Sequence, residues 1–345
     1  MKALRLHGRG DLRLHEEPEP DPGEGELLLR VTAVGLCGSD RHWLTEGGIG
    51  DAVLTVPLVL GHEFVGTIES GPRAGERVVV DPAVPCRRCS VCLAGRPHLC
   101  PELRFAGHGS TDGALRTLLA WPERLAHRLP DSLPDAEGAL LEPLGVALHA
   151  LDLGRVRAGA TAGVFGCGPI GLLLVQALRA VGATAILATD RLPHRVAAAA
   201  ALGATHALDA DEALADRGLL ERLHGGGGVD VAFEVAGEDA ALADAIDAVR
   251  PGGRVVVVGI PDGDRTSFTA STARRKGLTL LLCRRMEPAD LPRAIRLVET
   301  GCVELAPLVS ERYALSQWNE AFGALVERRG LRAIVEPQRV SEGAT

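Results

Sequence analysis

The chain has 345 residues, a length typical of about two domains. Its 46% of hydrophobic residues is enough for buried cores and too high for a disordered protein, and its net charge of −8 argues against a nucleic-acid partner. No apolar run reaches the roughly 18 residues of a membrane span, and the first residues have no signal-peptide core. We therefore expect a cytoplasmic protein that contacts neither a membrane nor nucleic acid.

The first part of the chain, to about residue 150, is predicted to be rich in β-structure. Short apolar segments bounded by glycine, proline or aspartate are typical of strands. The clearest of these segments are 27–31, 65–68 and 77–80.

Four of the eight cysteines lie close together in this part: Cys86, Cys89, Cys92 and Cys100. In a reducing compartment such a group indicates a metal site rather than disulfides. Four thiolates at this spacing fit a closed tetrahedral zinc site of structural type, and an iron–sulfur cluster is the alternative. Cys283 and Cys302 stand alone, and we expect them to be buried.

From about residue 160 the pattern changes to strands that alternate with helices. The expected strands are 162–165, 185–189, 229–233 and 254–258, and the helices 172–181, 195–202 and 240–249. This alternation predicts an α/β fold with a doubly wound parallel sheet. The glycine run at 224–228 is interpreted as a surface turn. After about residue 283 the pattern is mixed, with a helix over 291–299 and an apolar run over 331–335.

A glycine-rich turn joins the first of these strands to its helix. Its sequence, Gly166-Cys167-Gly168-Pro169-Ile170-Gly171, fits the G-x-G-x-x-G pattern that lets a backbone approach a pyrophosphate. Asp190 ends the next strand, where a carboxylate binds ribose hydroxyls and repels a 2′-phosphate. We therefore favour NAD over NADP. Arg191 and Arg195 weigh against a preference for NAD, because either could pair with a phosphate if Asp190 turned away. A tight strand–helix turn that binds no ligand is a further alternative.

A second set of possible metal ligands is spread along the first part of the chain: Cys37, His62, Glu63 and Glu142. One thiolate, one imidazole and one carboxylate would form a three-ligand zinc site with an open position, as catalytic zinc requires. From spacing alone this is weak, because a single histidine or glutamate is more often an ordinary polar group. Glu63 and Glu142 compete for the third position.

The order of these motifs resembles the zinc-dependent medium-chain dehydrogenases. They are G-L-C-G-S-D at 35–40, G-H-E at 61–63, the cysteine group, E-P-L at 142–144 and the glycine turn. The chain is most similar to the polyol (sorbitol, xylitol) and L-idonate-type members. The resemblance implies a GroES-like catalytic domain over 1–152 and 288–345, with a zinc lobe at 86–100, and a Rossmann domain over 153–287. It also implies two zinc ions per chain, NAD, a small polyol or alcohol substrate, and a homodimer or homotetramer.

The resemblance also implies roles for single residues. Cys37, His62 and Glu63 would bind the catalytic zinc, with Glu142 acting directly or through zinc-bound water. Ser39 would take the substrate proton and pass it through the cofactor ribose to His42. Arg285 matches an arginine near substrate and nicotinamide. Val258, Gly259 and Ile260 are expected to contact the cofactor.

Several positions depart from the polyol enzymes and leave the substrate open. Trp43 replaces a tyrosine, Arg284 and Met286 replace aromatic residues, and Leu118 and Leu119 lie where an aromatic substrate contact is common. A threonine-type amino-alcohol dehydrogenase and a simple alcohol dehydrogenase are the enzymatic alternatives. An alternative from another class is an NADPH reductase that has lost zinc, or a crystallin-like binding protein, on the same fold, and it would require missing ligands.

Overall fold

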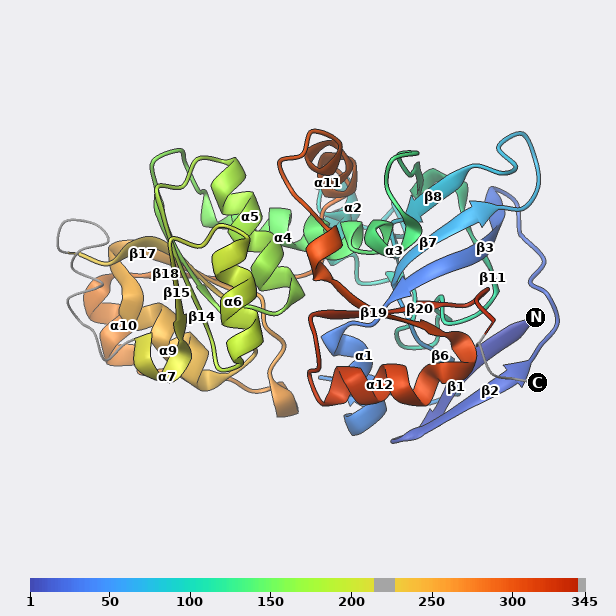
Figure 1. Ribbon diagram of the computed structural model, residues 1–345, viewed down its shortest axis with the longest axis horizontal. Helices are drawn as coiled ribbons and strands as arrows, with labels where there is room; N and C mark the ends of the chain where they lie inside the picture. Colours follow the sequence, from blue (N-terminus) through green and yellow to red (C-terminus); the bar gives the residue numbers. More distant parts are fainter. Residues whose placement is uncertain (214–226, 341–345) are drawn as a thin grey trace. The chain divides into compact units, whose positions relative to one another are not determined.

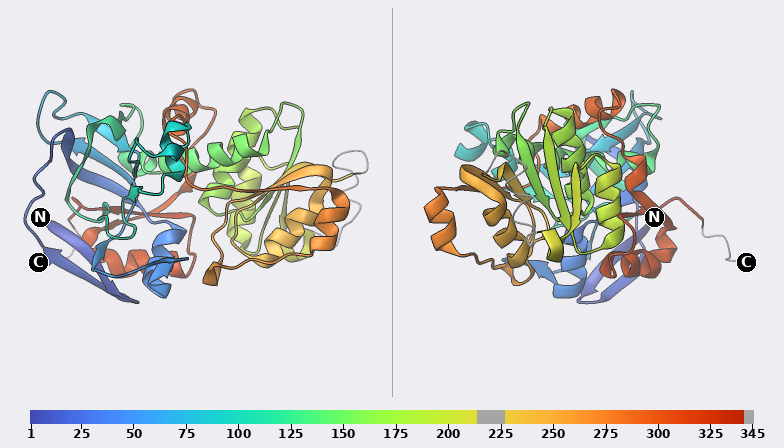
Figure 2. Two further views of the ribbon diagram at one scale, coloured as in Figure 1. Left: turned by 180° about the vertical axis from the view of Figure 1, so that it is seen from behind. Right: turned by 60° about the vertical axis from the view of Figure 1, so that its left-hand side comes forward.

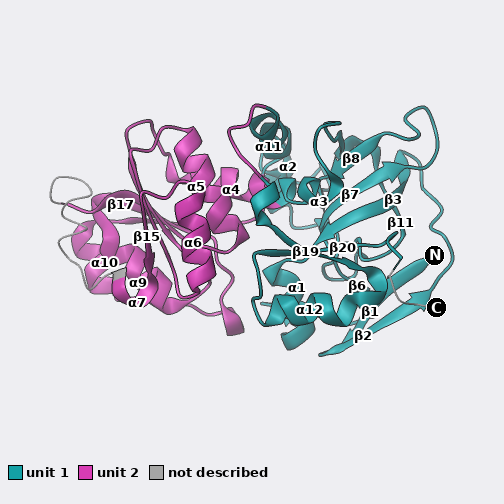
Figure 3. Cartoon of the chain, viewed as in Figure 1, with its two compact units in different colours: residues 1–142, 287–299, 305–345 teal, residues 143–286, 300–304 magenta. Residues whose placement is uncertain are grey.

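The computed structural model describes residues 1–213 and 227–340, which form two compact units (Figures 1 and 3). Unit 1 comprises residues 1–142, 287–299 and 305–345, and unit 2 comprises residues 143–286 and 300–304. Within the described ranges, no helix combines the length and apolar character needed to cross a membrane. The turn expected at 224–228 falls largely outside the described residues.

Unit 1 is built on a seven-stranded sheet of order β12-β8-β7-β3-β20-β19, with β11 also paired to β3. Its strands are β3 (Glu26–Gly35), β7 (Glu63–Ile68), β8 (Arg77–Val80), β11 (Leu118–Pro122), β12 (Ala126–Arg128), β19 (Val309–Ala314) and β20 (Arg332–Glu336). A smaller sheet of order β2-β1-β6 contains β1 (Lys2–Gly8), β2 (Asp11–Glu16) and β6 (Leu58–Val59). The short pairs are β4 (Gly48–Ile49) with β5 (Ala52–Val53), and β9 (Ala83–Val84) with β10 (Arg104–Phe105).

The last strand returns the chain to the middle of the unit 1 sheet. Val335 of β20 pairs with Val34 of β3, and Val335 and Phe322 lie in the same buried core as Leu4 and Phe64. The helices of the unit are α1 (Gly38–Glu46), α2 (Ser90–Leu93), α3 (Asp135–Gly138), α11 (Asp290–Glu299) and α12 (Trp318–Val326). Helix α4 (Leu141–Gly154) begins at the end of the first segment of unit 1.

Unit 2 contains a six-stranded parallel sheet of order β15-β14-β13-β16-β17-β18. Its strands are β13 (Thr161–Phe165), β14 (Ala185–Asp190), β15 (His206–Asp209), β16 (Val229–Glu234), β17 (Val249–Val257) and β18 (Thr279–Leu282). The helices are α5 (Pro169–Ala180), α6 (Pro193–Ala201), α7 (Ala210–Ala213), α9 (Asp239–Ala248) and α10 (Ala270–Lys276), and they cover both faces of the sheet (Figure 2). The predicted doubly wound α/β fold is confirmed.

The strand order places a switch point beside β13. Strand β14 pairs with one edge of β13, and β16, which follows later in the chain, pairs with its other edge. The direction in which strands are added to the sheet therefore reverses at β13. Ligands of such sheets bind at the carboxyl ends of the strands next to this point. Helix α5 begins at Pro169, three residues before the predicted start, because the fixed φ of proline suits the first helical position.

Candidate zinc centres and dinucleotide site

Three predicted ligands of the catalytic zinc come together in unit 1. Cys37 follows β3 and is the N-cap of α1, and His62 and Glu63 lie at the start of β7, where Glu63 pairs with Gly35 of β3. Cys37, His62 and Glu63 each offer a ligand atom, and these atoms lie within 4.8 Å of one another. Sulfur, imidazole nitrogen and carboxylate oxygen form a donor set that zinc accepts.

The carboxyl group of Glu63 is buried. Among the described residues neither of its oxygens accepts a hydrogen bond, although Nη2 of Arg332 lies 3.1 Å from Oε1. Burial raises the pKa of Glu63 to about 8, and the guanidinium of Arg332 opposes this. A cation bound by Cys37, His62 and Glu63 would satisfy these oxygens, so the residues present fit a zinc ion.

Glu142 lies next to this group, in the first turn of α4. It is buried, and burial raises its pKa to about 8, while the imidazole of His62 lowers it and Glu63 raises it further. Two buried carboxyl groups beside a thiol and an imidazole produce a local excess of acidic groups. Such an arrangement is costly to ionise unless a metal ion balances it.

Two further buried residues hold the ligands in place. Both oxygens of Asp40 accept backbone hydrogen bonds, from Cys37 N at 2.9 Å and from Gly61 N at 3.3 Å, and Oδ1 lies 3.8 Å from Nδ1 of His62. Arg332, on β20, donates to the carbonyl of Leu36 as well as approaching Glu63. Partners of this kind orient metal ligands. Sequence analysis missed both roles: Asp40 lies inside a motif, whereas no local signal marks Arg332.

Ser39 and His42 follow Cys37 on α1. The hydroxyl of Ser39 lies 3.4 Å from Nε2 of His62, and His42 is buried, with its Nδ1 2.6 Å from Oε1 of Glu46 one turn further along the helix. The helix thus places a hydroxyl beside the predicted ligand His62 and an imidazole on the next turn. This is a suitable arrangement for moving a proton.

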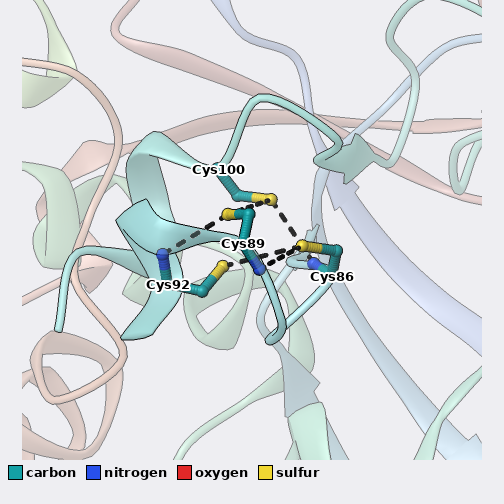
Figure 4. A group of neighbouring side chains, drawn as sticks. All are labelled: Cys86, Cys89, Cys92 and Cys100. Carbon is teal, nitrogen blue, oxygen red and sulfur yellow. Dashed lines mark hydrogen bonds between the residues drawn. The ribbon is translucent and has the colours of Figure 1, made fainter. Parts of the chain in front are cut away.

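The four clustered cysteines point toward one another in a separate lobe (Figure 4). All four thiols are free, and their sulfur atoms lie within 4.8 Å of one another, with Cys86 and Cys92 4.0 Å apart and Cys89 and Cys100 3.9 Å apart. A tetrahedron with Zn–S bonds of about 2.3 Å has sulfur–sulfur edges of about 3.8 Å. The lobe therefore fits a zinc ion with four thiolate ligands.

Backbone amides already stabilise negative charge in this lobe. The amides of Cys86, Cys89 and Cys92 donate to the sulfurs of Cys100, Cys86 and Cys89, each at 3.4 Å. Backbone hydrogen bonds from Arg88 and Cys89 lower the pKa of Cys86 to about 7. The loop thus favours the thiolate of Cys86, the form that binds metal, whereas burial raises the pKa of Cys92 to about 12.

The glycine turn lies between β13 and α5, as predicted. Gly166 has φ of +108°, and a side chain there would lie 2.8 Å from the amide nitrogen of Ala236, so only glycine fits. Gly168 is the N-cap of α5, and Pro169, Ile170 and Gly171 form its first turn. The turn therefore leaves the N-terminal amides of α5 beside the carboxyl ends of β13 and β16.

Asp190 is held firmly at the end of β14. Its Oδ2 accepts from the amide of Cys167 at 2.8 Å and its Oδ1 from the amide of Leu192 at 2.9 Å. Nη1 of Arg195 lies 3.9 Å from Oδ2 of Asp190, and Nε of Arg191 lies 3.9 Å from Oδ1 of Asp211. Both arginines next to the predicted ribose site are thus close to a carboxylate.

Val258, Gly259 and Ile260 follow β17 on the same edge of the sheet. The amides of Val258 and Gly259 donate to the carbonyl of Glu234, at 2.8 and 3.2 Å. The loops after β13, β16 and β17 therefore meet at one edge, where the cofactor contacts were predicted.

Arg285 and two isolated cysteines complete the comparison with the sequence predictions. Arg285 lies in unit 2 and has φ of +60°, and its role near the substrate stays a prediction. The expectation that Cys283 and Cys302 are buried is wrong: Cys283 is half-buried and Cys302 is exposed. Cys302 follows a glycine after α11 and accepts a hydrogen bond from Thr300 at 3.4 Å.

Comparison with known proteins identifies the family of the chain. Residues 23–131 match the alcohol dehydrogenase GroES-like domain, and residues 169–300 match the zinc-binding dehydrogenase family. The chain is 35% identical to the sorbitol dehydrogenase of Bacillus subtilis, with 98% of each chain covered. It belongs to the zinc-dependent medium-chain dehydrogenases.

Solved structures of this family share the fold. A zinc-binding dehydrogenase of Sinorhizobium meliloti 1021 bound to NADP is 32% identical, with a TM-score of 0.87 and coverage of 97% of this chain and 99% of that one. The 2R,3R-butanediol dehydrogenase of Bacillus subtilis is 31% identical, with a TM-score of 0.86 and coverage of 98% and 99%. The chain is therefore a zinc-dependent oxidoreductase that uses a nicotinamide cofactor.

Proposed function

We propose that this dehydrogenase oxidises a secondary alcohol of a polyol or sugar-derived substrate to a ketone, with NAD as the hydride acceptor. The observation that carries the proposal is the group of Cys37, His62 and Glu63, with its buried and unsatisfied carboxyl oxygens. It is supported by 35% identity to a sorbitol dehydrogenase over nearly the whole chain.

The residues of the chain have distinct parts in this reaction. Zinc held by Cys37, His62 and Glu63, with Glu142 beside it, would supply Lewis acidity toward the substrate hydroxyl, and NAD would accept the hydride. Asp40 and Arg332 would keep His62 and Glu63 oriented, because each contacts its partner from a buried position.

Ser39 and His42 would remove the proton. Ser39 lies beside His62 and can receive the proton from the substrate hydroxyl. His42, on the next turn of α1, would then hold the proton for release to solvent. Glu46, at 2.6 Å from Nδ1 of His42, orients the imidazole.

Preference for NAD over NADP follows from the fixed position of Asp190. Turning its carboxylate away from the ribose site would break two backbone hydrogen bonds, at 2.8 and 2.9 Å. A 2′-phosphate would meet this carboxylate, and Arg191 and Arg195 are already close to acidic partners. We further propose a second, structural zinc in the four-cysteine lobe, and a homodimer or homotetramer.

A substrate panel tests the proposal directly. Initial rates of NAD and NADP reduction would be measured with sorbitol, xylitol, galactitol, myo-inositol, L-idonate, 2,3-butanediol, L-threonine and simple alcohols, together with zinc content. We expect two zinc ions per chain and the highest kcat/KM with a polyol and NAD. Turnover of L-threonine alone, or of primary alcohols alone, would overturn the polyol assignment.

A further inference from the structure

A turn in unit 1 is fixed directly onto the segment that carries His62. It spans residues 105–113, and the amide of Gly113 donates to the carbonyl of Val59 at 2.7 Å. Gly107 has φ of +69°, and a side chain there would lie 2.8 Å from the amide nitrogen of Gly61. The two backbones therefore touch, which leaves this turn little freedom to move relative to the zinc ligand.

A charged network fastens the far end of the same turn. Oδ1 of Asp112 accepts from the amide of Val59 at 3.1 Å, and Oδ2 lies 2.7 Å from Nη2 of Arg5 and 3.4 Å from Nη1 of Arg116. Within the turn, the amide of His108 donates to the carbonyl of Phe105 at 3.1 Å. The side chains on the turn are thus presented from a rigid backbone.

These side chains form a row of rings that starts at the zinc ligand. The ring centroids of His62 and Phe105 are 5.4 Å apart, those of Phe105 and His108 6.4 Å, and those of His108 and Trp43 5.3 Å. His108 meets both Phe105 and Trp43 edge to face, with interplanar angles of 89° and 84°. Phe105 and His108 are half-buried, whereas Trp43 is fully buried.

We propose that His108 is a specificity residue whose imidazole hydrogen-bonds a hydroxyl of the substrate other than the one that is oxidised. In the row beyond His62, the imidazole is the one ring that both donates and accepts hydrogen bonds, since Phe105 has no polar atom and an indole only donates. This inference rests on the proposed polyol substrate.

The chemistry of this row of rings explains why a polyol would suit a site that it lines. An apolar wall binds the carbon chain of any alcohol equally well, whereas a fixed hydrogen-bonding group discriminates against a substrate that lacks the matching hydroxyl. His108 would therefore favour polyols over simple alcohols that have the same reacting carbinol.

The test compares two substrates in three variants. His108→Phe keeps a ring against Trp43 and Phe105 but removes both nitrogens, and His108→Gln keeps a donor and an acceptor. His206→Phe, in β15 of unit 2, is the matched control. We expect His108→Phe to lower kcat/KM for sorbitol or xylitol about tenfold and to change kcat/KM for 2-butanol less than twofold. His108→Gln should restore most of the polyol rate, and the control should resemble the unaltered chain.

The outcomes separate the inference from the proposed function. An equal fall for both substrates would show that His108 only supports packing, and unchanged rates for both substrates would show that it does not face the substrate. Either result refutes the inference while polyol turnover by the unaltered chain stands. Absence of polyol turnover in the unaltered chain refutes the proposed function and this inference with it.

Discussion

Replacing Arg332 by methionine tests whether Glu63 belongs to a metal site. The guanidinium is 4% exposed, and it lies 3.1 Å from Oε1 of Glu63, whose carboxyl group has no hydrogen bond among the described residues. Breaking a buried ion pair by removing one partner costs about 3–5 kcal/mol, because a buried charge is left uncompensated. At a pH above about 8, where the carboxyl group of Glu63 is ionised, Arg332→Met should therefore lower the free energy of unfolding of zinc-free protein by about this amount.

Zinc changes the size of that loss. An ion bound by Glu63 compensates the carboxylate from the other side, so the same substitution should cost zinc-loaded protein about 1–2 kcal/mol, chiefly the lost hydrogen bond to the carbonyl of Leu36. Urea unfolding followed by tryptophan fluorescence is a suitable assay. Trp43, Trp121 and Trp318 all lie in unit 1, so the signal reports the unit that contains the site.

A surface pair provides the control for this experiment. Arg30 and Glu69 are 2.6 Å apart, but the Arg30 side chain is 52% exposed, so Arg30→Met should cost less than about 1 kcal/mol with or without zinc. The reasoning is refuted if Arg332→Met destabilises chelated and zinc-loaded protein equally. It is also refuted if the loss in chelated protein is as small as that of the control.

Three further predictions concern the two candidate zinc centres and the dinucleotide site. Burial raises the pKa of Glu63 and of Glu142 to about 8, above the unfolded value of about 4.5. The free energy of unfolding of zinc-free protein should therefore fall as the pH rises from about 5 to 8. Bound zinc should make this fall smaller, which urea titrations at successive pH values would measure. The double substitution of Cys89 and Cys92 by serine should lower zinc content from two ions to one and the melting temperature measurably, with a modest change in kcat. Loss of hydride transfer at unchanged stability would contradict a structural lobe. Asp190→Ala should raise KM for NAD about 10–100-fold and narrow its advantage over NADP, and an unchanged preference would contradict the ribose-binding role.

The parts of the site that lie close together in sequence could be predicted before the structure was known. The four cysteines and the turn from Gly166 to Gly171 each place their chemistry in one short segment, and the structure brings those residues together. The parallel sheet was also accessible, because buried strands and helices alternate at regular intervals. The cysteine lobe, the glycine turn and the alternating strands and helices depend on the local conformation of the backbone. That conformation is determined largely by neighbouring residues in the sequence.

Features that depend on contacts between distant segments were missed. Arg332 reaches Glu63 only because β20 returns to pair with β3, and no pattern around Arg332 indicates this. The burial of a single residue could not be predicted either. Cys302 lies in a turn that leaves it exposed, although cysteine is usually buried. Side-chain environments of this kind are decided by tertiary packing, which one sequence does not display.

The return of the C-terminal segment gives the catalytic site its electrostatic balance. Without β20, the ionisable groups beside Cys37 and His62 would be the carboxyl groups of Asp40, Glu63 and Glu142, and all three are buried. Arg332 places one positive charge among them before any metal binds, and Asp40 is further stabilised by two backbone amides. The fold therefore balances part of this acidic group with a residue of its own before a metal binds. That combination favours a site formed in advance of the metal over one that the metal must organise.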